Sequence, residues 1–140
     1  MSEALEFLND LFAKAKKAGA DAADGHHVVS QSLSTSMRMG KREDLERSES
    51  LDMMLRVFIG QRQACVASSD TSAQAMEELV ERAVSMAKVA PEDPYCGLAP
   101  EDRLAKKWPD LDLFDDYEYD TEALYGIAAE TEEAALAVDG

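Results

Sequence analysis

The sequence predicts an α+β fold: a helix, an antiparallel meander of about four strands, a second helix, a long acidic connection and a C-terminal helix. Two periodicities in the 140 residues predict it. Apolar residues recur every three or four positions over 5–15 and 76–87, as on a helix, and at alternate positions over 29–39 and 51–59, as on a strand. A sheet with one apolar face needs a cover, which the two helices can supply.

The first helix begins near Ser2, the expected N-cap, and ends at Gly19, a residue type that favours the position just after a helix. Its apolar stripe consists of Leu5, Leu8, Leu11, Phe12 and Ala15, widened by Phe7. Lys14, Lys16 and Lys17 fall in the last turn, where positive charge suits the helix dipole. We therefore expect an amphipathic helix that packs on the sheet.

Short hairpin turns join the expected strands, which cover about 22–39, 43–48, 51–59 and 63–68. The first strand has one face of Val29, Leu33, Met37 and Met39 and a wet face of Ser30, Ser32, Ser34 and Ser36. Gly40–Lys41 is the expected first turn, and a second turn falls at 60–62. The charges of 43–48 place that strand towards an edge of the sheet.

The second helix starts at Ser72, stops before Pro91, and carries the stripe Met76, Leu79, Val80, Ala83, Val84 and Ala87. Residues 91–120 break both periodicities and form a long connection, whose scattered aromatic residues are expected to dock on the core. Asp120 or Thr121 then caps a last helix with the weak stripe Leu124, Ala128, Thr131, Ala135 and Val138. This stripe is typical of an element separated from the structure it packs against.

Composition indicates one soluble domain. With 46% hydrophobic residues, a chain of this length can bury one core. The N-terminal residues carry acids where a secretory signal needs positive charge, and no apolar run reaches the roughly 20 residues of a membrane span. We expect a cytoplasmic protein that does not bind membranes.

The net charge of −15 is concentrated in the last third of the chain. Residues 1–90 hold 14 acids and 11 bases, whereas residues 91–140 hold 15 acids and 3 bases. Direct binding to nucleic acid is disfavoured, because phosphate contacts need clustered Lys and Arg. The acidic run is interpreted as a solvated surface, and the alternative is a docking face for a basic partner.

The two cysteines are predicted to be reduced thiols. Cys65 lies between apolar neighbours on a predicted strand, so we expect it to be buried. Cys96 lies in a loop near prolines and is expected to be the more exposed thiol. Neither has a histidine nearby in sequence, which leaves the assignment of a nucleophile unsupported.

No residue pattern predicts a catalytic, cofactor-binding or metal site. His26 and His27 are adjacent on a strand, so they point to opposite faces and do not share a metal. The sequence contains no His-Glu-x-x-His or Cys-x-x-Cys spacing and no glycine-rich phosphate loop. The acidic pairs Asp115–Asp116 and Glu132–Glu133 lack a partner that would separate their pKa values. Trp108 is interpreted as a packing anchor.

Several motifs, taken in order, resemble a known family. They are Ala-Lys-Lys-Ala-Gly-Ala-Asp-Ala-Ala (15–23), Ser-Leu-Ser-Thr-Ser-Met-Arg-Met-Gly-Lys-Arg-Glu-Asp-Leu-Glu-Arg-Ser-Glu (32–49), Leu-Arg-Val-Phe-Ile-Gly-Gln-Arg-Gln-Ala (55–64), Ala-Ser-Ser-Asp (67–70), Leu-Val-Glu-Arg-Ala-Val (79–84) and Ala-Pro-Glu-Asp-Pro-Tyr (90–95). The pattern resembles the N-terminal domain of the PmbA/TldD family, called modulators of DNA gyrase, and is closer to the PmbA (TldE) branch. The resemblance implies a domain at 1–98 and, at 99–140, an acidic connection and helix that lead to a C-terminal domain absent from this chain.

The resemblance also implies a function. Full-length relatives are longer and work as homo- or heterodimers, in which a TldD-type zinc peptidase cuts unfolded peptides, including microcin precursors and antitoxin. The metal motif lies beyond this chain, and PmbA-type subunits are taken to lack the ligands, so no catalytic residue and no cofactor is carried over; zinc belongs to the partner subunit. The gyrase label reflects genetics and implies no binding to DNA.

The leading hypothesis is therefore a non-catalytic N-terminal domain of a PmbA-like subunit that serves assembly and substrate access in a peptidase complex. The alternative is a free-standing acidic module that binds a basic partner. A weaker third hypothesis is a hydrolase that uses Cys96. The length of the native reading frame distinguishes the first two.

Overall fold

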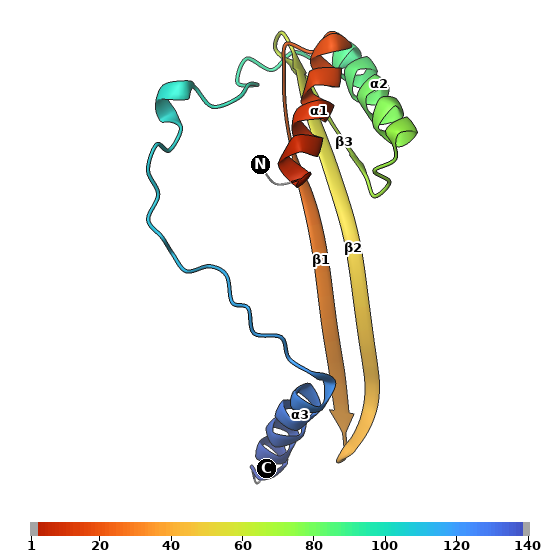
Figure 1. Ribbon diagram of the computed structural model, residues 1–140, viewed down its shortest axis with the longest axis vertical. Helices are drawn as coiled ribbons and strands as arrows, with labels where there is room; N and C mark the ends of the chain where they lie inside the picture. The colour runs from red at the N-terminus through yellow and green to blue at the C-terminus, as the bar shows by residue number, and fades with distance from the viewer. Residues whose placement is uncertain (1–2, 139–140) are drawn as a thin grey trace. The chain divides into compact units, whose positions relative to one another are not determined.

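The computed structural model describes residues 3–138, so the predicted N-cap Ser2 lies outside the described residues. The elements are α1 (Glu3–Lys17), β1 (Ala22–Arg38), β2 (Lys41–Ile59), β3 (Arg62–Ser68), α2 (Ala73–Val89), a 3₁₀ turn (Glu101–Arg103) and α3 (Thr121–Leu136), as Figure 1 shows. This order confirms the predicted α+β arrangement, with a long connection before the last helix. No described helix has both the length and the apolar character that crossing a membrane requires.

The chain divides into two compact units. The helix–sheet unit comprises the residues up to Val29 together with Ser50–Lys106. The hairpin–helix unit comprises Ser30–Glu49 together with the residues from Lys107 onward. Strands β1 and β2 contribute residues to both units, and each unit is described separately below.

The sheet has three strands in the order β1-β2-β3, so the expectation of about four strands was wrong. Residues 43–48 and 51–59, expected as two strands, form the single 19-residue strand β2. The predicted strands left a gap at 49–50, but these residues include no glycine or proline to turn the chain. A strand that is wet on both faces shows no apolar alternation, which is why its continuity is not visible in the sequence.

The first hairpin turn lies one residue earlier than expected, at Met39–Gly40. Both residues have positive φ, 51° and 69°, and Lys41 already belongs to β2. Two consecutive left-handed residues match the twist of a two-residue hairpin. The second turn contains Gly60, at φ 57°, as expected.

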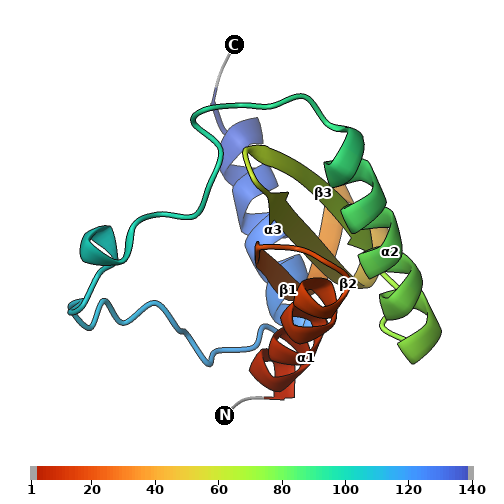
Figure 2. The same cartoon turned by 90° about the horizontal axis from the view of Figure 1, so that it is seen from above.

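The core lies between one face of the sheet and helices α1 and α2, which Figure 2 shows on the same side. Its buried members from the sheet are Met53, Leu55, Val57, Ala64 and Val66. In register, Leu55 is opposite Val66 and Val57 is opposite Ala64, so the inward side chains of β2 and β3 form neighbouring pairs. All six residues of the predicted α2 stripe are buried, which confirms that pattern.

Two other predicted apolar faces are buried less than expected. In α1, Leu11 and Ala15 are buried, whereas Leu5 is half exposed. Strand β1 has no fully buried residue, and Val29 remains 63% exposed. Leu33 and Met37 of the predicted apolar face are half-buried, but Val29 and Met39 are exposed, so the burial of this strand does not follow the predicted alternation.

Gly25 allows β1 to approach its neighbour closely, which gives a test of the fold. A Cβ atom built at Gly25 would lie 2.3 Å from the carbonyl oxygen of Met54 and 3.3 Å from Phe12. We expect Gly25→Ala to destabilise the chain by about 1–3 kcal/mol, because backbone must shift to admit the methyl group. Urea unfolding followed by circular dichroism measures the change.

Gly126→Ala is the matched control, because open space surrounds Gly126 within α3. Alanine there should preserve or raise stability, since glycine inside a helix costs about 1 kcal/mol relative to alanine. An equal loss of stability in both variants would contradict the close approach at Gly25.

Candidate functional site

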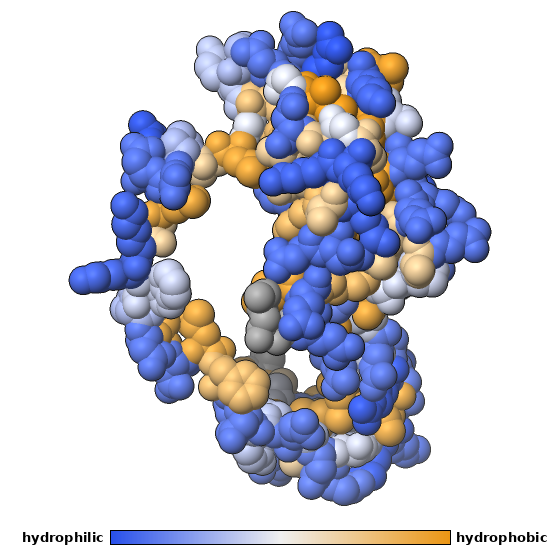
Figure 3. Space-filling view, turned by 45° about the horizontal axis from the view of Figure 1, so that its top comes forward, coloured by the Kyte–Doolittle hydropathy of each residue, from blue (hydrophilic) through white to orange (hydrophobic). Residues whose placement is uncertain are grey.

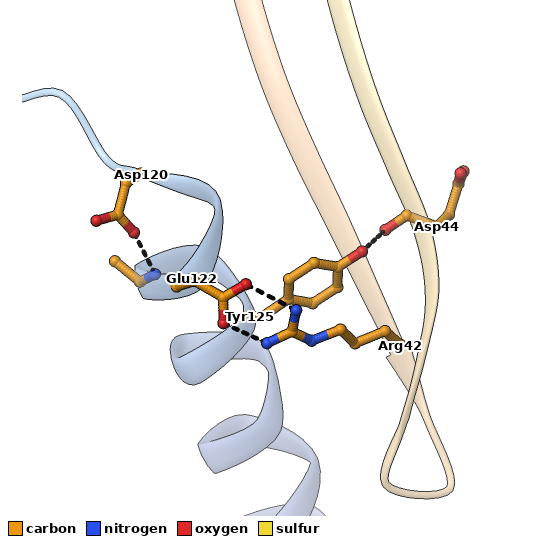
Figure 4. A network of polar contacts seen from close by, with 6 residues as sticks. Arg42, Asp44, Asp120, Glu122 and Tyr125 are labelled. Atoms are coloured by element: carbon orange, nitrogen blue, oxygen red, sulfur yellow. Dashed lines mark hydrogen bonds and ion pairs between the residues drawn. The ribbon is translucent and has the colours of Figure 1, made fainter.

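The best-defined polar cluster in the hairpin–helix unit joins the start of β2 to the first turns of α3. Figure 4 shows Arg42 directing its guanidinium group towards Glu122. Nη1 of Arg42 donates to Oε1 of Glu122 at 2.7 Å, and Nη2 donates to the second oxygen, so the pair is bidentate. Planar bidentate pairing fixes orientation as well as distance. The pair therefore sets how α3 lies on the hairpin.

Tyr125 provides the apolar part of the same contact. It is the one fully buried residue of α3, and the guanidinium carbon of Arg42 lies 4.3 Å from its ring centroid. Its hydroxyl donates to the backbone oxygen of Asp44 at 2.9 Å. Asp120 caps α3 by accepting from the Ala123 amide at 2.7 Å, which confirms the predicted helix start.

A second acidic residue of α3 binds the hairpin turn itself. The carboxylate of Glu132 accepts from the backbone N–H of Met39 at 2.6 Å and from that of Gly40 at 2.7 Å. The two left-handed residues present both N–H groups to one anion, an arrangement called a nest. The turn residues therefore have a carboxylate partner 93 and 92 positions away in sequence.

The ion pair shifts the acidity of both partners. Hydrogen bonds from the Arg42 side chain hold the pKa of the Glu122 carboxyl below its usual value, although desolvation acts in the opposite direction. The same bonds raise the pKa of Arg42. A carboxyl whose pKa falls on folding stabilises the fold above its usual pKa, and this contribution is lost as the pH drops through the folded-state pKa. Acid is therefore expected to loosen this contact.

These residues were not found from the sequence. The predicted stripe of α3 is correct for Leu124 and Ala128, which are half-buried, but Thr131, Ala135 and Val138 are exposed. The helix faces the hairpin with Tyr125 and Glu132 instead. The two glutamates were interpreted as solvated charge because their partners are a distant arginine and backbone groups, neither of which creates a local pattern.

A cavity of about 330 Å³ lies elsewhere in the hairpin–helix unit. It is lined by residues of the β1 and β2 arms and by residues 118–124, among them Ser32, Leu33, Arg47, Glu118, Tyr119 and Leu124. Its walls are part polar and part apolar, with one basic and one acidic side chain. This mixed lining suits an amphipathic or charged side chain of a bound molecule.

Both cysteines are free thiols, as predicted, but the predictions of their exposure were wrong. Cys65 is exposed and Cys96 is half-buried. The neighbours Ala64 and Val66 face the core, so the alternation of a strand turns Cys65 to the opposite face. There it lies opposite Arg56, whose guanidinium forms a bidentate ion pair with Asp24 that raises the pKa of Arg56.

The remaining candidate residues are placed as follows. His27 lies 5.5 Å from the ring of Phe7 in an edge-on contact, whereas His26 is exposed. Trp108 is 78% exposed, so the prediction that it acts as a packing anchor was wrong. The other aromatic residues of 91–120 are also more than half exposed, so the prediction that they dock on the core was wrong too: Tyr95, Phe114, Tyr117 and Tyr119. Of the predicted wet face, Ser30, Ser32 and Ser34 are exposed as expected, whereas Ser36 is half-buried. Within residues 3–138, no group of three or more His, Cys, Asp or Glu is arranged to hold a metal ion.

Comparison with known proteins gives the family. Residues 27–87 match the model of PmbA/TldA metallopeptidase domain 1. The chain carries the first domain of the PmbA/TldD family. It is 33% identical over 139 residues to a metalloprotease PmbA homolog of Haemophilus influenzae, and 30% identical over 137 residues to metalloprotease PmbA of Escherichia coli O157:H7. These matches confirm the resemblance inferred from the sequence.

The matches also show how much of the relatives this chain represents. They cover 99% and 96% of the chain but 30% of each curated relative. A Bacteroides thetaiotaomicron structure described as a modulator of DNA gyrase aligns with TM-score 0.87 and 20% identity, over 99% of this chain and 32% of that one. TldE from Thermococcus kodakarensis aligns with TM-score 0.72 and 16% identity, over 92% and 29%. Because the identities are only 20% and 16%, these two structures show that the fold is shared and nothing beyond the fold.

Replacing the arginine of the ion pair tests its electrostatic effect. In Arg42→Gln, we expect the pKa of Glu122 to rise towards its usual value, because the charged hydrogen bonds that favour the carboxylate are lost. An NMR titration of the Glu122 carboxyl carbon measures the pKa of this group in the original chain and in the variant. Arg38→Gln, which affects an exposed pair with Glu43, serves as a control. An unchanged titration midpoint in Arg42→Gln would contradict the assignment.

The nest at the hairpin turn is tested with neighbouring glutamates. Glu132→Gln should accelerate hydrogen exchange at the amides of Met39 and Gly40, because a neutral amide oxygen binds the two N–H groups more weakly than a carboxylate. Glu133→Gln removes the same charge from an exposed position and should leave these amides unchanged. Equal exchange in both variants would rule out the contact in solution.

Proposed function

We propose that this chain is the non-catalytic N-terminal part of a PmbA/TldE-like subunit in a TldD/PmbA-type metallopeptidase complex, where it serves assembly and substrate access. The observation that supports this most strongly is the match of nearly the whole chain to 30% of two PmbA metalloproteases. In this proposal, 1–98 form the N-terminal domain, and 99–140 lead to a further domain. The complex would act on peptides in the cytoplasm.

The distribution of side chains supports a role without catalysis in this chain. The family is described as metallopeptidase, which implies a metal centre, yet residues 3–138 contain no group of His, Cys, Asp or Glu suited to hold one. The described polar clusters connect elements of the fold to each other. We therefore place the reacting groups outside this chain, assign zinc to a TldD-type partner because the family resemblance implies it, and derive no catalytic step through this chain.

Exposed apolar side chains support a role in assembly. In the hairpin–helix unit, four large ones lie close together in sequence: Trp108, Leu111, Leu113 and Phe114, each more than 60% exposed. Figure 3 shows apolar residues open on the visible face among polar ones. Surfaces of this kind are characteristic of protein contacts. We assign this segment to the contact with a TldD/PmbA-type subunit, as a homo- or heterodimer.

A second candidate function is an acidic module that binds a basic partner. The charge of residues 91–140, with 15 acids against 3 bases, favours it. This function needs neither a peptidase subunit nor a further domain. The two candidates differ in which partner the chain selects.

A binding experiment with a TldD-type subunit tests the leading proposal. We expect this chain to co-elute with a TldD-type subunit from the same organism in size-exclusion chromatography, and Trp108→Ser with Phe114→Ser to weaken the complex by removing apolar contact area. Val89→Ser is the matched control, because Val89 is 84% exposed outside this segment. Peptide hydrolysis should require the TldD-type subunit.

Two results would contradict the proposal. One is failure to bind the TldD-type subunit while binding a basic protein in a salt-sensitive manner, which would favour the acidic module. The other is peptide hydrolysis by this chain alone that Cys96→Ala abolishes, which would restore the hydrolase hypothesis.

A further inference from the structure

Strand β1 is an edge strand of the sheet, and its part in the hairpin–helix unit is partly exposed: Leu33, Thr35, Ser36 and Met37 are half-buried. The strand order is β1-β2-β3, so β1 pairs on one side with β2 and has no strand on its other side among residues 3–138. From Ser30 to Ser32 and at Ser34, the side chains are exposed. An edge of this kind presents unpaired backbone N–H and C=O groups, which are a template for another extended chain.

The two arms of the hairpin differ sharply in charge. Residues 41–49 of β2 include seven charged side chains: Lys41, Arg42, Glu43, Asp44, Glu46, Arg47 and Glu49. Residues 30–37 of β1 include no Asp, Glu, Lys, Arg or Pro. Charges and prolines on edge strands block unwanted pairing. The arm of β2 has this protection, and the edge of β1 lacks it.

A cavity accompanies this unprotected edge. It is bounded by Ser32 and Leu33 of β1, by Arg47 of β2, and by Glu118, Tyr119 and Leu124. Its volume of about 330 Å³ exceeds that of one side chain. Recognition by strand addition combines backbone hydrogen bonds at the edge with pockets for side chains of the added strand. Edge and pocket are therefore the two parts that such recognition requires.

The charge near the edge selects the kind of partner. Residues 107–120 contain six acids and one base: Asp110, Asp112, Asp115, Asp116, Glu118, Asp120 and Lys107. These charges attract a basic segment and repel an acidic one. A second copy of this chain, with a net charge of −15, is disfavoured for the same reason.

We propose that the outer edge of β1 over residues 30–37 binds an extended basic polypeptide segment as an added strand, with one of its side chains in the cavity beside Leu33. This role goes beyond assembly with a peptidase subunit and does not depend on it, because edge and cavity both belong to this chain. The partner is defined by three properties: an extended backbone, positive charge, and a side chain that fits a mixed polar and apolar pocket.

Three labelled peptides of about ten residues test the proposal on the whole chain by fluorescence anisotropy. The first alternates lysine and valine, the second has the same sequence with alternate backbone nitrogens methylated, and the third alternates glutamate and valine. We expect the first to bind, and the other two to bind about tenfold more weakly or worse, because one loses backbone hydrogen bonds and the other charge attraction. Equal binding of the first two peptides, or no binding of the first, would overturn the proposal.

Hydrogen exchange and one pair of variants locate the site. The lysine–valine peptide should protect amides within residues 30–37 and leave α2 unchanged. Ser34→Lys places a charge on the edge and should weaken binding about tenfold, whereas Ser34→Thr retains an uncharged strand residue and should bind like the original chain. Circular dichroism checks that both variants are folded.

If the peptide slows hydrogen exchange only within residues 107–120, charge attraction alone explains the binding. This result would overturn the proposal of strand addition. Analytical ultracentrifugation of the chain without peptide tests whether a second copy of the chain occupies the edge instead. A dimer that Ser34→Lys dissociates would assign the edge to a second copy, and would likewise overturn the proposal.

Discussion

Burial on one side of the sheet is the constraint on which the rest of this structure depends. Met53, Leu55 and Val57 face helices α1 and α2 and are fully buried. The same strand, β2, contains a run of charged residues over 41–49, where no side chain is buried. A hydrophobic core can stabilise only the part of the strand that contributes to it. The hairpin arm must therefore be held by other forces.

Helix α3 supplies those forces through polar contacts at defined points. A two-stranded hairpin alone is marginal in water, so contacts with a third element matter for its order. Glu132 binds the N–H groups of the turn, and Tyr125 contacts both Arg42 and the backbone of Asp44. Ion pairs and hydrogen bonds at exposed positions hold orientation more than they add stability. The hairpin–helix unit is thus held together mainly by directed hydrogen bonds and ion pairs, whereas the helix–sheet unit is held together by apolar packing.

This difference explains what the sequence could predict. The stripe of α2, the alternation over 51–59 and the glycine turns follow from burial and backbone conformation, which leave periodic or local signals. The continuity of β2 and the docking face of α3 depend on contacts with other elements, which for α3 lie up to 93 residues away. The orientation of Cys65 depends on which face of β3 meets the core. The pairing of Arg42 with Glu122 leaves no pattern in the amino-acid sequence from which it could be predicted. The candidate site was therefore missed, while the core was found.

The lack of burial in the hairpin arm also bears on function. A strand edge inside a core is occupied by its neighbours, whereas the outer edge of β1 between Ser30 and Met37 has no strand beside it among residues 3–138. Contacts from α3 at the turn, rather than a covering strand, hold this arm, and no other strand pairs with its outer edge among the described residues. The polar attachment of α3 is what makes such an edge compatible with a stable fold.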